Sequence, residues 1–195
     1  MGYYVEDTST WENWQREYRL GLILIIPPEK VLRQIEPLRM KYDPRSFRCY
    51  PAHISISDPL CEEVTPELQR EIEVSLRGID PFTLYYDKPS ASKEHPGVVY
   101  PIRPQEPIDE LKRVLHASSA FRGRAYCRRD ILAHMTIAEF LSIEESMKVC
   151  AELLDSAPTA SFLCDRLELI VPNENFQFQR CGTFFLKQPS DDCLI

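Results

Sequence analysis

Two short segments of this 195-residue chain repeat one order of residue types: histidine, apolar, hydroxyl, apolar. Residues 53–56 read HISI and residues 134–137 read HMTI, and an alanine precedes each histidine. At ordinary composition, a given histidine meets this pattern by chance about 2% of the time. The chain has only four histidines, so two matches point to a repeated functional element rather than to coincidence.

Paired histidines are suited to moving protons near neutral pH, because one imidazole can be neutral while another is charged. In phosphodiester cleavage, one group removes a proton from the attacking oxygen and another protonates the leaving oxygen. Neighbouring hydroxyls can donate hydrogen bonds to the phosphate oxygens as charge builds on them. We therefore predict His53 and His134 as the catalytic acid and base, and Ser55 and Thr136 as phosphate-binding residues.

The elements that carry these residues are predicted to be strands, over residues 52–57 and 132–140. A strand has a period of two, so the histidine and hydroxyl of each segment share one face. The apolar residues then belong in the core, and the polar face looks into a cleft. A plainer structural interpretation remains open, in which the four polar residues are simply satisfied strand positions.

Local charge supports a phosphate site. The formal net charge is −7, which argues against non-specific adhesion to nucleic acid. In contrast, residues 39–50 and 121–130 each hold four arginines or lysines against one aspartate, and each segment leads into a histidine strand. We interpret both segments as basic loops at the mouth of the cleft, with Arg48 and Arg124 as candidate substrate-binding residues.

Aromatic side chains near the same strands could stack against a nucleobase. We predict Tyr50, Tyr100 and Phe176 in this role, with Phe178 beside them. Cysteine, histidine and carboxylate residues show no metal-ligand spacing, so we predict neither a metal site nor a cofactor.

The remaining elements follow from apolar periodicity and from capping residues. We expect a strand at 19–26 and a helix that starts at Pro28 and ends or kinks at Pro37. Thr65 should cap a helix over 66–77, and Ser142 with Glu145 should open one that ends near 155. Further expected elements are a helix at 107–118 and strands at 82–86, 98–103, 161–171 and 176–187. A single domain over 19–187 would then lie between an N-terminal arm, 1–18, and a loose tail, 188–195.

Composition also bears on location. No apolar run is long enough to span a membrane, and no secretory signal is recognisable. The seven cysteines are scattered and odd in number, which is typical of reduced thiols. We expect a monomeric intracellular protein, cytoplasmic with a nuclear location as the alternative, without membrane association.

The two motifs, about eighty residues apart, resemble the signature of the two-histidine phosphoesterase superfamily, in particular its 2′-5′ RNA ligase-like branch. Residues 50–53, 98–100 and 132–138 are also similar in type and order to that branch, and the resemblance covers about residues 19–187. It implies an α+β fold of two lobes, with two antiparallel-rich sheets related by pseudo-two-fold symmetry around a central cleft and helices outside. It also implies His53 and His134 as acid and base, with Ser55 and Thr136 on the phosphate.

The resemblance further implies a substrate: an RNA end or nucleotide with a 2′,3′-cyclic phosphate or a 2′,5′ linkage, hydrolysed without a metal. Many relatives carry arginine or lysine shortly after the second motif, whereas this chain has Glu139 there and Asp58 after the first motif. The cation that binds phosphate must therefore come from elsewhere. Two alternatives stay open: an RNA 3′-end exonuclease of the same superfamily, and a binding module for RNA ends or nucleotides without turnover.

Overall fold

The computed structural model describes residues 4–187, and the predicted tail at 188–195 lies outside them. Its strands form one continuous sheet in the order β7-β3-β5-β6-β2-β1-β8-β9, with β4 paired to β5. Every pair is antiparallel. The strands are β1 (Leu22–Ile25), β2 (Ile54–Ser55), β3 (Phe82–Tyr86), β4 (Ser90–Ala91), β5 (Val98–Arg103), β6 (His134–Ala138), β7 (Ala160–Cys164), β8 (Arg166–Pro172) and β9 (Phe178–Phe185).

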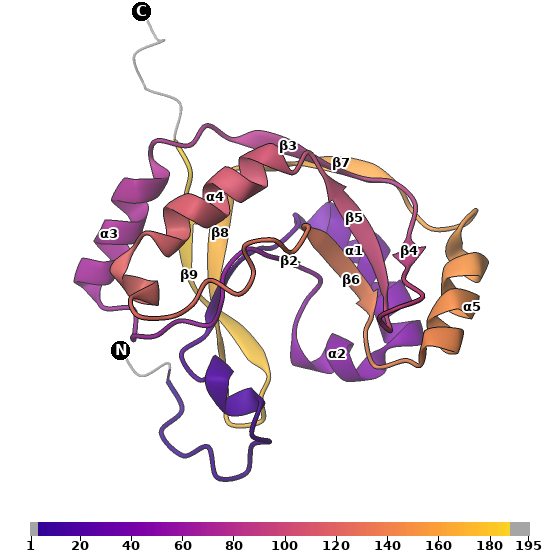
Figure 1. Cartoon of the computed structure of the whole chain (residues 1–195), viewed down its shortest axis with the longest axis horizontal. Helices are drawn as coiled ribbons and strands as arrows, with labels where there is room; N and C mark the ends of the chain where they lie inside the picture. The colour runs from indigo at the N-terminus through magenta and orange to yellow at the C-terminus, as the bar shows by residue number, and fades with distance from the viewer. Residues whose placement is uncertain (1–3, 188–195) are drawn as a thin grey trace, which may run out of the picture.

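Helices pack against this sheet at both of its ends. Figure 1 shows α3 and α4 together beside β8 and β9, and α5 at the opposite end beside β4. The helices are α1 (Glu29–Tyr42), α2 (Pro44–Cys49), α3 (Pro66–Leu76), α4 (Glu106–His116) and α5 (Ile143–Leu153), with short 3-10 turns η1 (Gln15–Tyr18) and η2 (Ser119–Phe121).

Two helix starts confirm the capping predictions. Thr65 accepts a hydrogen bond from the backbone N–H of Leu68 at the start of α3. Ser142 and Glu145 form the reciprocal capping box of α5. Each cap satisfies backbone N–H groups that a helix start leaves unpaired, which stabilises the helix by about 1 kcal/mol.

Apart from the short elements α2, β4 and η2, the two halves of the chain repeat one order of elements: β1-α1-β2-α3-β3 and then β5-α4-β6-α5-β7. The two motif strands, β2 and β6, are neighbours in the sheet, and Ile54 pairs with Met135. These residues occupy the same position in their motifs, so a local two-fold axis passes between them. The predicted α+β fold with pseudo-two-fold symmetry is confirmed, and the sheets of the two halves join at these strands into one curled antiparallel sheet.

The apolar face of each motif lies in the core, as the alternation predicts. Ile54, Ile56, Met135 and Ile137 are all fully buried. Burying each such side chain contributes about 1.5–3 kcal/mol, which strongly resists a shift of register by one residue. This packing fixes which face of β2 and β6 carries the polar residues.

Two sequence expectations were wrong in detail. Residues 39–50, expected as a loop, are almost entirely helical, and of the two outcomes expected at Pro37, the structure excludes the end of the helix, because α1 continues past it. The end of α1 is held by tertiary contacts of Arg39, which offset the hydrogen bond that Pro37 removes. The expected strand at 161–171 is two strands, β7 and β8, which pair with different neighbours.

The described part of the N-terminal arm packs against the turn between β8 and β9. The indole N–H of Trp11 donates to the backbone carbonyl of Glu174 at 2.9 Å, and Trp11 is almost fully buried. This contact brings the following residues, including Trp14, onto the polar side of the sheet. No helix among the described residues has both the length and the apolar character needed to cross a membrane.

Candidate active site

The pairing of β2 with β6 brings the two motifs together. Because Ile54 pairs with Met135 in an antiparallel register, His53 lies opposite Thr136, and Ser55 lies opposite His134. The two histidines are therefore diagonal neighbours, whose Cβ atoms in such a pairing are typically about 7–8 Å apart. Each histidine faces the hydroxyl residue of the other motif, and all four side chains are partly exposed.

Both imidazoles are held in the same orientation by their own chain. His53 Nδ1 lies 2.9 Å from the carbonyl of Pro51, and His134 Nδ1 lies 2.9 Å from that of Leu132. A carbonyl only accepts hydrogen bonds, so Nδ1 must carry the hydrogen in each case. In the neutral ring this leaves the lone pair on Nε2, and neither Nε2 has a hydrogen-bond partner among residues 4–187.

The surroundings of His53 favour its neutral form. Burial lowers the pKa of His53 to about 4, and the positive charges of Arg39 and Arg128 act in the same direction. The hydrogen bond to Pro51 opposes this shift but does not cancel it. At neutral pH, His53 therefore offers an unprotonated Nε2 to the site.

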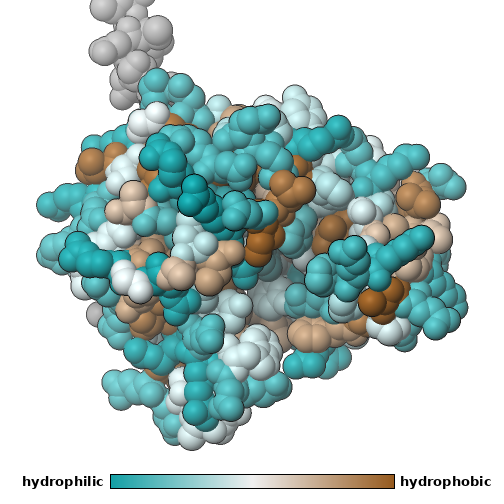
Figure 2. Space-filling model, viewed as in Figure 1, coloured by the Kyte–Doolittle hydropathy of each residue, from teal (hydrophilic) through white to brown (hydrophobic). Residues whose placement is uncertain are grey.

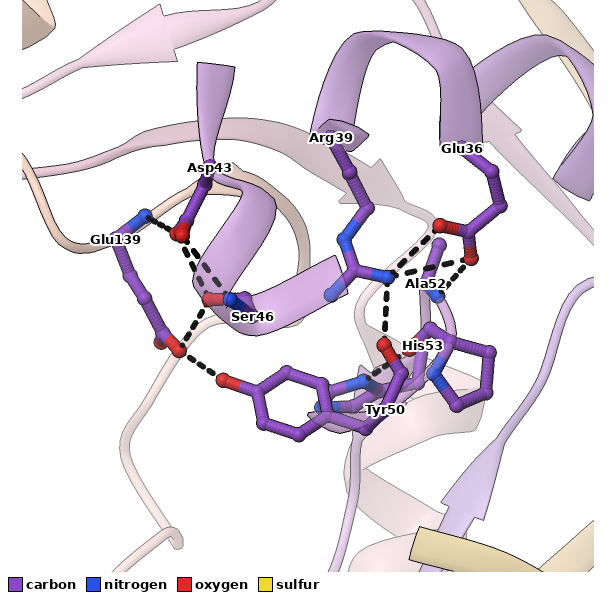
Figure 3. A network of polar contacts seen from close by, with 9 residues as sticks. Glu36, Arg39, Asp43, Ser46, Tyr50, Ala52, His53 and Glu139 are labelled. Carbon is purple, nitrogen blue, oxygen red and sulfur yellow. Dashed lines mark hydrogen bonds and ion pairs between the residues drawn. The ribbon is translucent and has the colours of Figure 1, made fainter. Parts of the chain in front are cut away.

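A buried ionic network fixes the segment that leads into His53 (Figure 3). Arg39 donates to both carboxylate oxygens of Glu36 and, at 2.8 Å, to the carbonyl of Tyr50. Glu36 in turn accepts from the backbone N–H of Ala52 at 2.6 Å. Arg39 is 1% exposed, so its assignment to a phosphate-binding basic loop was wrong: its charge is used inside the protein.

The motif residues line a pocket of about 350 Å³, within the range of small-molecule sites. In Figure 2 the visible face is mainly hydrophilic and is hollowed near its middle, where Figure 1 places β2 and β6. A larger hollow of about 560 Å³, lined by Glu73, Arg77 and Lys187, contains neither motif. The pocket is lined by Trp14, Tyr18, Leu22, Leu24, Tyr50, His53, Ser55, Arg128, His134, Thr136, Glu139, Phe140, Ile170, Phe176 and Phe178.

Arg128 is the only arginine or lysine in this lining. It belongs to the basic segment 121–130, but Arg124, the candidate chosen there, does not line the pocket, and neither does Arg48. Asp58 holds this segment in place: it accepts from the backbone N–H of Cys127 at 2.8 Å and lies 4.0 Å from the Arg128 guanidinium. The segment was correctly identified, but the sequence did not indicate which arginine would reach the pocket.

Aromatic residues form one wall of the pocket. Tyr50 and Phe176 line it as predicted, and the ring of Tyr50 stands edge-on to His53 with centroids 5.2 Å apart. Phe176 is only 5% exposed and lies at the centre of a cluster with Trp11, Trp14, Tyr18 and Phe178, so the more exposed Trp14 offers more open surface.

Tyr100 does not line the pocket, contrary to the prediction. Its side chain is fully buried and packs against Tyr86, with ring centroids 5.0 Å apart. Val98 and Ile102, two residues to either side, are also fully buried. This alternation was visible in the sequence and places Tyr100 on the apolar face of its strand.

Sequence reasoning also missed Trp14, Glu139 and Phe140 as pocket residues. Trp14 comes from the arm, and no local pattern indicates where an arm will pack. Glu139 follows β6 directly, and its carboxylate accepts hydrogen bonds from the hydroxyls of Ser46 and Tyr50. Burial raises the pKa of Glu139. Its position five residues after His134, equivalent to that of Asp58 after His53, was the available signal.

Comparison with known proteins decides the family. The family model described as the 2′-5′ RNA ligase superfamily matches residues 27–175, more than half of the chain. The chain belongs to this superfamily. The resemblance stated from the two motifs is thereby confirmed, and the protein is a two-histidine phosphoesterase by family.

Individual relatives are distant but cover most of the chain. The protein named "Putative phosphoesterase OB1230" of Oceanobacillus iheyensis is 23% identical over 84% of this chain and 96% of its own length. Crystal structures of Escherichia coli LigT with NADP+ and with 3′-AMP have TM-scores of 0.55, at 17% and 18% identity. They cover 86% of this chain and 96–97% of LigT, and at this identity they support the fold alone.

Proposed function

We propose that this phosphoesterase hydrolyses a 2′,3′-cyclic phosphate or a 2′,5′ phosphodiester at an RNA end or in a nucleotide, and that it needs no metal. The observation that carries the proposal is the diagonal pair of histidines, each with Nδ1 fixed by a carbonyl and Nε2 directed away from that bond. Binding alone requires neither a second histidine nor this matched orientation.

His53 is the base in this mechanism, because its lowered pKa keeps Nε2 unprotonated. Nε2 removes a proton from a water molecule, and the resulting oxygen attacks phosphorus. The bond from phosphorus to one ribose oxygen breaks, and His134 donates a proton to that oxygen. The products are a phosphomonoester and a ribose hydroxyl, and each proton transfer is expected to contribute about 10²–10⁴-fold to the rate.

The phosphate lies over the polar face that the two paired strands share. The hydroxyls of Ser55 and Thr136 donate hydrogen bonds to the non-bridging oxygens as negative charge develops on them, and Arg128 supplies the positive charge. The net charge of the substrate phosphate is −1, so one arginine with two hydroxyls is a balanced set of partners. This assignment replaces the candidates Arg48 and Arg124.

A nucleoside fits the rest of the pocket. A volume of about 350 Å³ is suited to a single nucleotide, and the wall that contains Trp14 and Tyr50 offers aromatic surface for a base. LigT, which shares this fold, has been crystallised with 3′-AMP, ATP and NADP+. These complexes make nucleotide recognition a reasonable proposal for this chain too.

The decisive experiment offers the purified protein a nucleoside 2′,3′-cyclic phosphate and a short 2′,5′-linked oligonucleotide, in EDTA. Wild-type turnover that persists in EDTA and is lost in His53→Ala and His134→Ala would support the mechanism, and the products would identify the bond. Stepwise shortening of a 3′,5′-linked RNA would instead favour the 3′-end exonuclease. Tight nucleotide binding without any turnover would favour the binding module.

A further inference from the structure

The two halves of the protein brace each other through equivalent carboxylates. Asp58 and Glu139 each follow a motif histidine by five residues. Asp58 accepts from the backbone N–H of Cys127, seven residues before His134. Glu139 accepts from the hydroxyl of Ser46 at 2.9 Å, seven residues before His53. Each carboxylate therefore holds the segment that leads into the histidine of the other half.

The two braces differ in what else they face. Asp58 is 3% exposed and does not line the pocket, whereas Glu139 is part of its wall. Both side-chain hydrogen bonds to Glu139 end on Oε1, and within residues 4–187 its Oε2 has no hydrogen-bond partner. A side chain that only braced Ser46 would not need to face the pocket.

Within residues 4–187, the carboxylate of Glu139 forms no ion pair. The nearby guanidinium groups of Arg39 and Arg45 pair with Glu36 and Glu12 instead (Figure 3 shows the first pair). Hydroxyls of Ser46 and Tyr50 stabilise the ionised carboxylate without neutralising it. A negative charge therefore stands in the wall of the pocket proposed to bind phosphate, opposed there by the single cation of Arg128.

Such a charge acts differently on substrate and product. A phosphodiester carries one negative charge, whereas a phosphomonoester carries about 1.5 to 2 at neutral pH, since its second pKa is about 6. Repulsion by a carboxylate grows with the charge of the ligand. The same residue that weakens substrate binding slightly must weaken monoester binding more.

We propose that Glu139 is a specificity-determining residue that makes this pocket prefer singly charged phosphodiesters and release doubly charged phosphomonoesters. The inference rests on the proposed function, because that reaction turns the first class of ligand into the second. Terminal phosphomonoesters at RNA ends are then poor ligands, and the product of hydrolysis binds more weakly than the substrate.

Calorimetry at pH 8 with two matched ligands tests this directly. The probes are 2′-deoxyadenosine 3′-monophosphate and its methyl ester, which differ by one charge and lack the 2′-hydroxyl. Glu139→Gln removes the charge but keeps an acceptor oxygen for Ser46 and Tyr50. Glu144→Gln, which removes one exposed carboxylate outside the pocket lining, is the matched control.

We expect Glu139→Gln to strengthen binding of the monophosphate about five- to tenfold and that of the methyl ester about two- to threefold, because the repulsion energy is proportional to the charge of the ligand. The control should change neither. Equal changes for both ligands, no change, or no measurable binding of either ligand would overturn the inference. Glu139→Thr, which retains a hydroxyl group, provides a second uncharged variant if the glutamine variant does not fold.

Failure of the proposed reaction would be recognised separately. If the wild type binds the methyl ester more tightly than the monophosphate but hydrolyses neither a cyclic phosphate nor a 2′,5′ bond, the charge preference stands and the reaction does not. If it hydrolyses the cyclic phosphate but Glu139→Gln leaves the preference for the methyl ester unchanged, the reaction stands and the role of Glu139 does not.

Discussion

The two motif strands share one pattern but lie in different surroundings. Residues 50–53 are anchored by the buried network of Arg39 and Glu36 and follow the compact helices α1 and α2. In contrast, β6 follows an irregular segment in which Ile131 and Leu132 are 44% and 70% exposed. The second segment also has a buried support, because Lys112 donates to the Ile131 carbonyl at 2.7 Å, but more of its surface is open to solvent.

This difference separates two chemically identical side chains. Both imidazoles donate Nδ1–H to a carbonyl two residues back, so their orientations match. Burial and neighbouring positive charge lower the pKa of His53 to about 4. An acid and a base are needed together, and environments that differ around a repeated motif can supply both from one residue type.

The positive charge near each motif is also used differently. Arg39 is almost fully buried and supports the backbone before His53, whereas Arg128 lines the pocket beside the second motif. The comparison therefore assigns structural support to Arg39 and phosphate binding to Arg128. Four experiments test this comparison of the two motifs.

The largest effect should separate acid from base. On a 2′,3′-cyclic phosphate, His53→Ala and His134→Ala should each lower kcat by about 10²–10⁴-fold. A 4-nitrophenyl phosphodiester releases a stable anion that needs no proton, so His134→Ala should come within about tenfold of wild type on thymidine 3′-(4-nitrophenyl phosphate), whereas His53→Ala should not. If the 4-nitrophenyl substrate instead restored the activity of His53→Ala, His53 would be the acid and His134 the base.

The next effect should separate support from binding. Arg39→Met breaks a buried ion pair and leaves Glu36 without its partner, so we expect the free energy of unfolding in urea to fall by about 3 kcal/mol. Arg128→Met should leave that free energy within about 0.5 kcal/mol of wild type but lower kcat/KM about 10–100-fold. A stable, inactive Arg39 variant would contradict the division of roles.

Much of this arrangement was predictable from local patterns. The alternation of apolar residues placed residues 54, 56, 135 and 137 in the core, and the same alternation put the four polar side chains on one face. Capping residues marked the starts of α3 and α5. These features depend on periodicity and nearest neighbours, which a single sequence displays fully.

Other features depend on partners that are distant in sequence. Arg39 looks like a solvated charge until α1 brings it to the carbonyl of Tyr50 and to Glu36. Trp14 reaches the pocket only because Trp11 anchors the arm to the β8–β9 turn. The choice of Arg128 over Arg124 depends on the path of an irregular segment. Tyr100, in contrast, carried a local signal, because the buried alternation of β5 excludes it from the pocket.

A smaller effect should come from replacing Asp58, which holds the segment that leads into His134. Asp58→Asn keeps one acceptor oxygen for Cys127 but removes the charge near Arg128, from which it lies 4.0 Å. We expect KM for the cyclic phosphate to rise about fivefold with kcat within twofold of wild type, because Arg128 is less well held. A loss of kcat with unchanged KM would mean that Asp58 acts on the chemistry through His134 rather than on phosphate binding.

The smallest expected change in rate concerns the pH dependence of kcat/KM, which tests whether His53 is held in its neutral form. The acidic limb of kcat/KM reports the base in the free enzyme. Because the pKa of His53 is lowered to about 4, His53 stays unprotonated as the pH falls through 6 and gains its proton only near 4. We therefore expect kcat/KM at pH 5.5 to remain within about twofold of its maximum, whereas a histidine of ordinary pKa, about 6.5, would cause a roughly tenfold loss. A midpoint near 6.5 that persists in Arg128→Met would show that the support around His53 does not hold it neutral, and the base would then have to be sought in the more open half of the site.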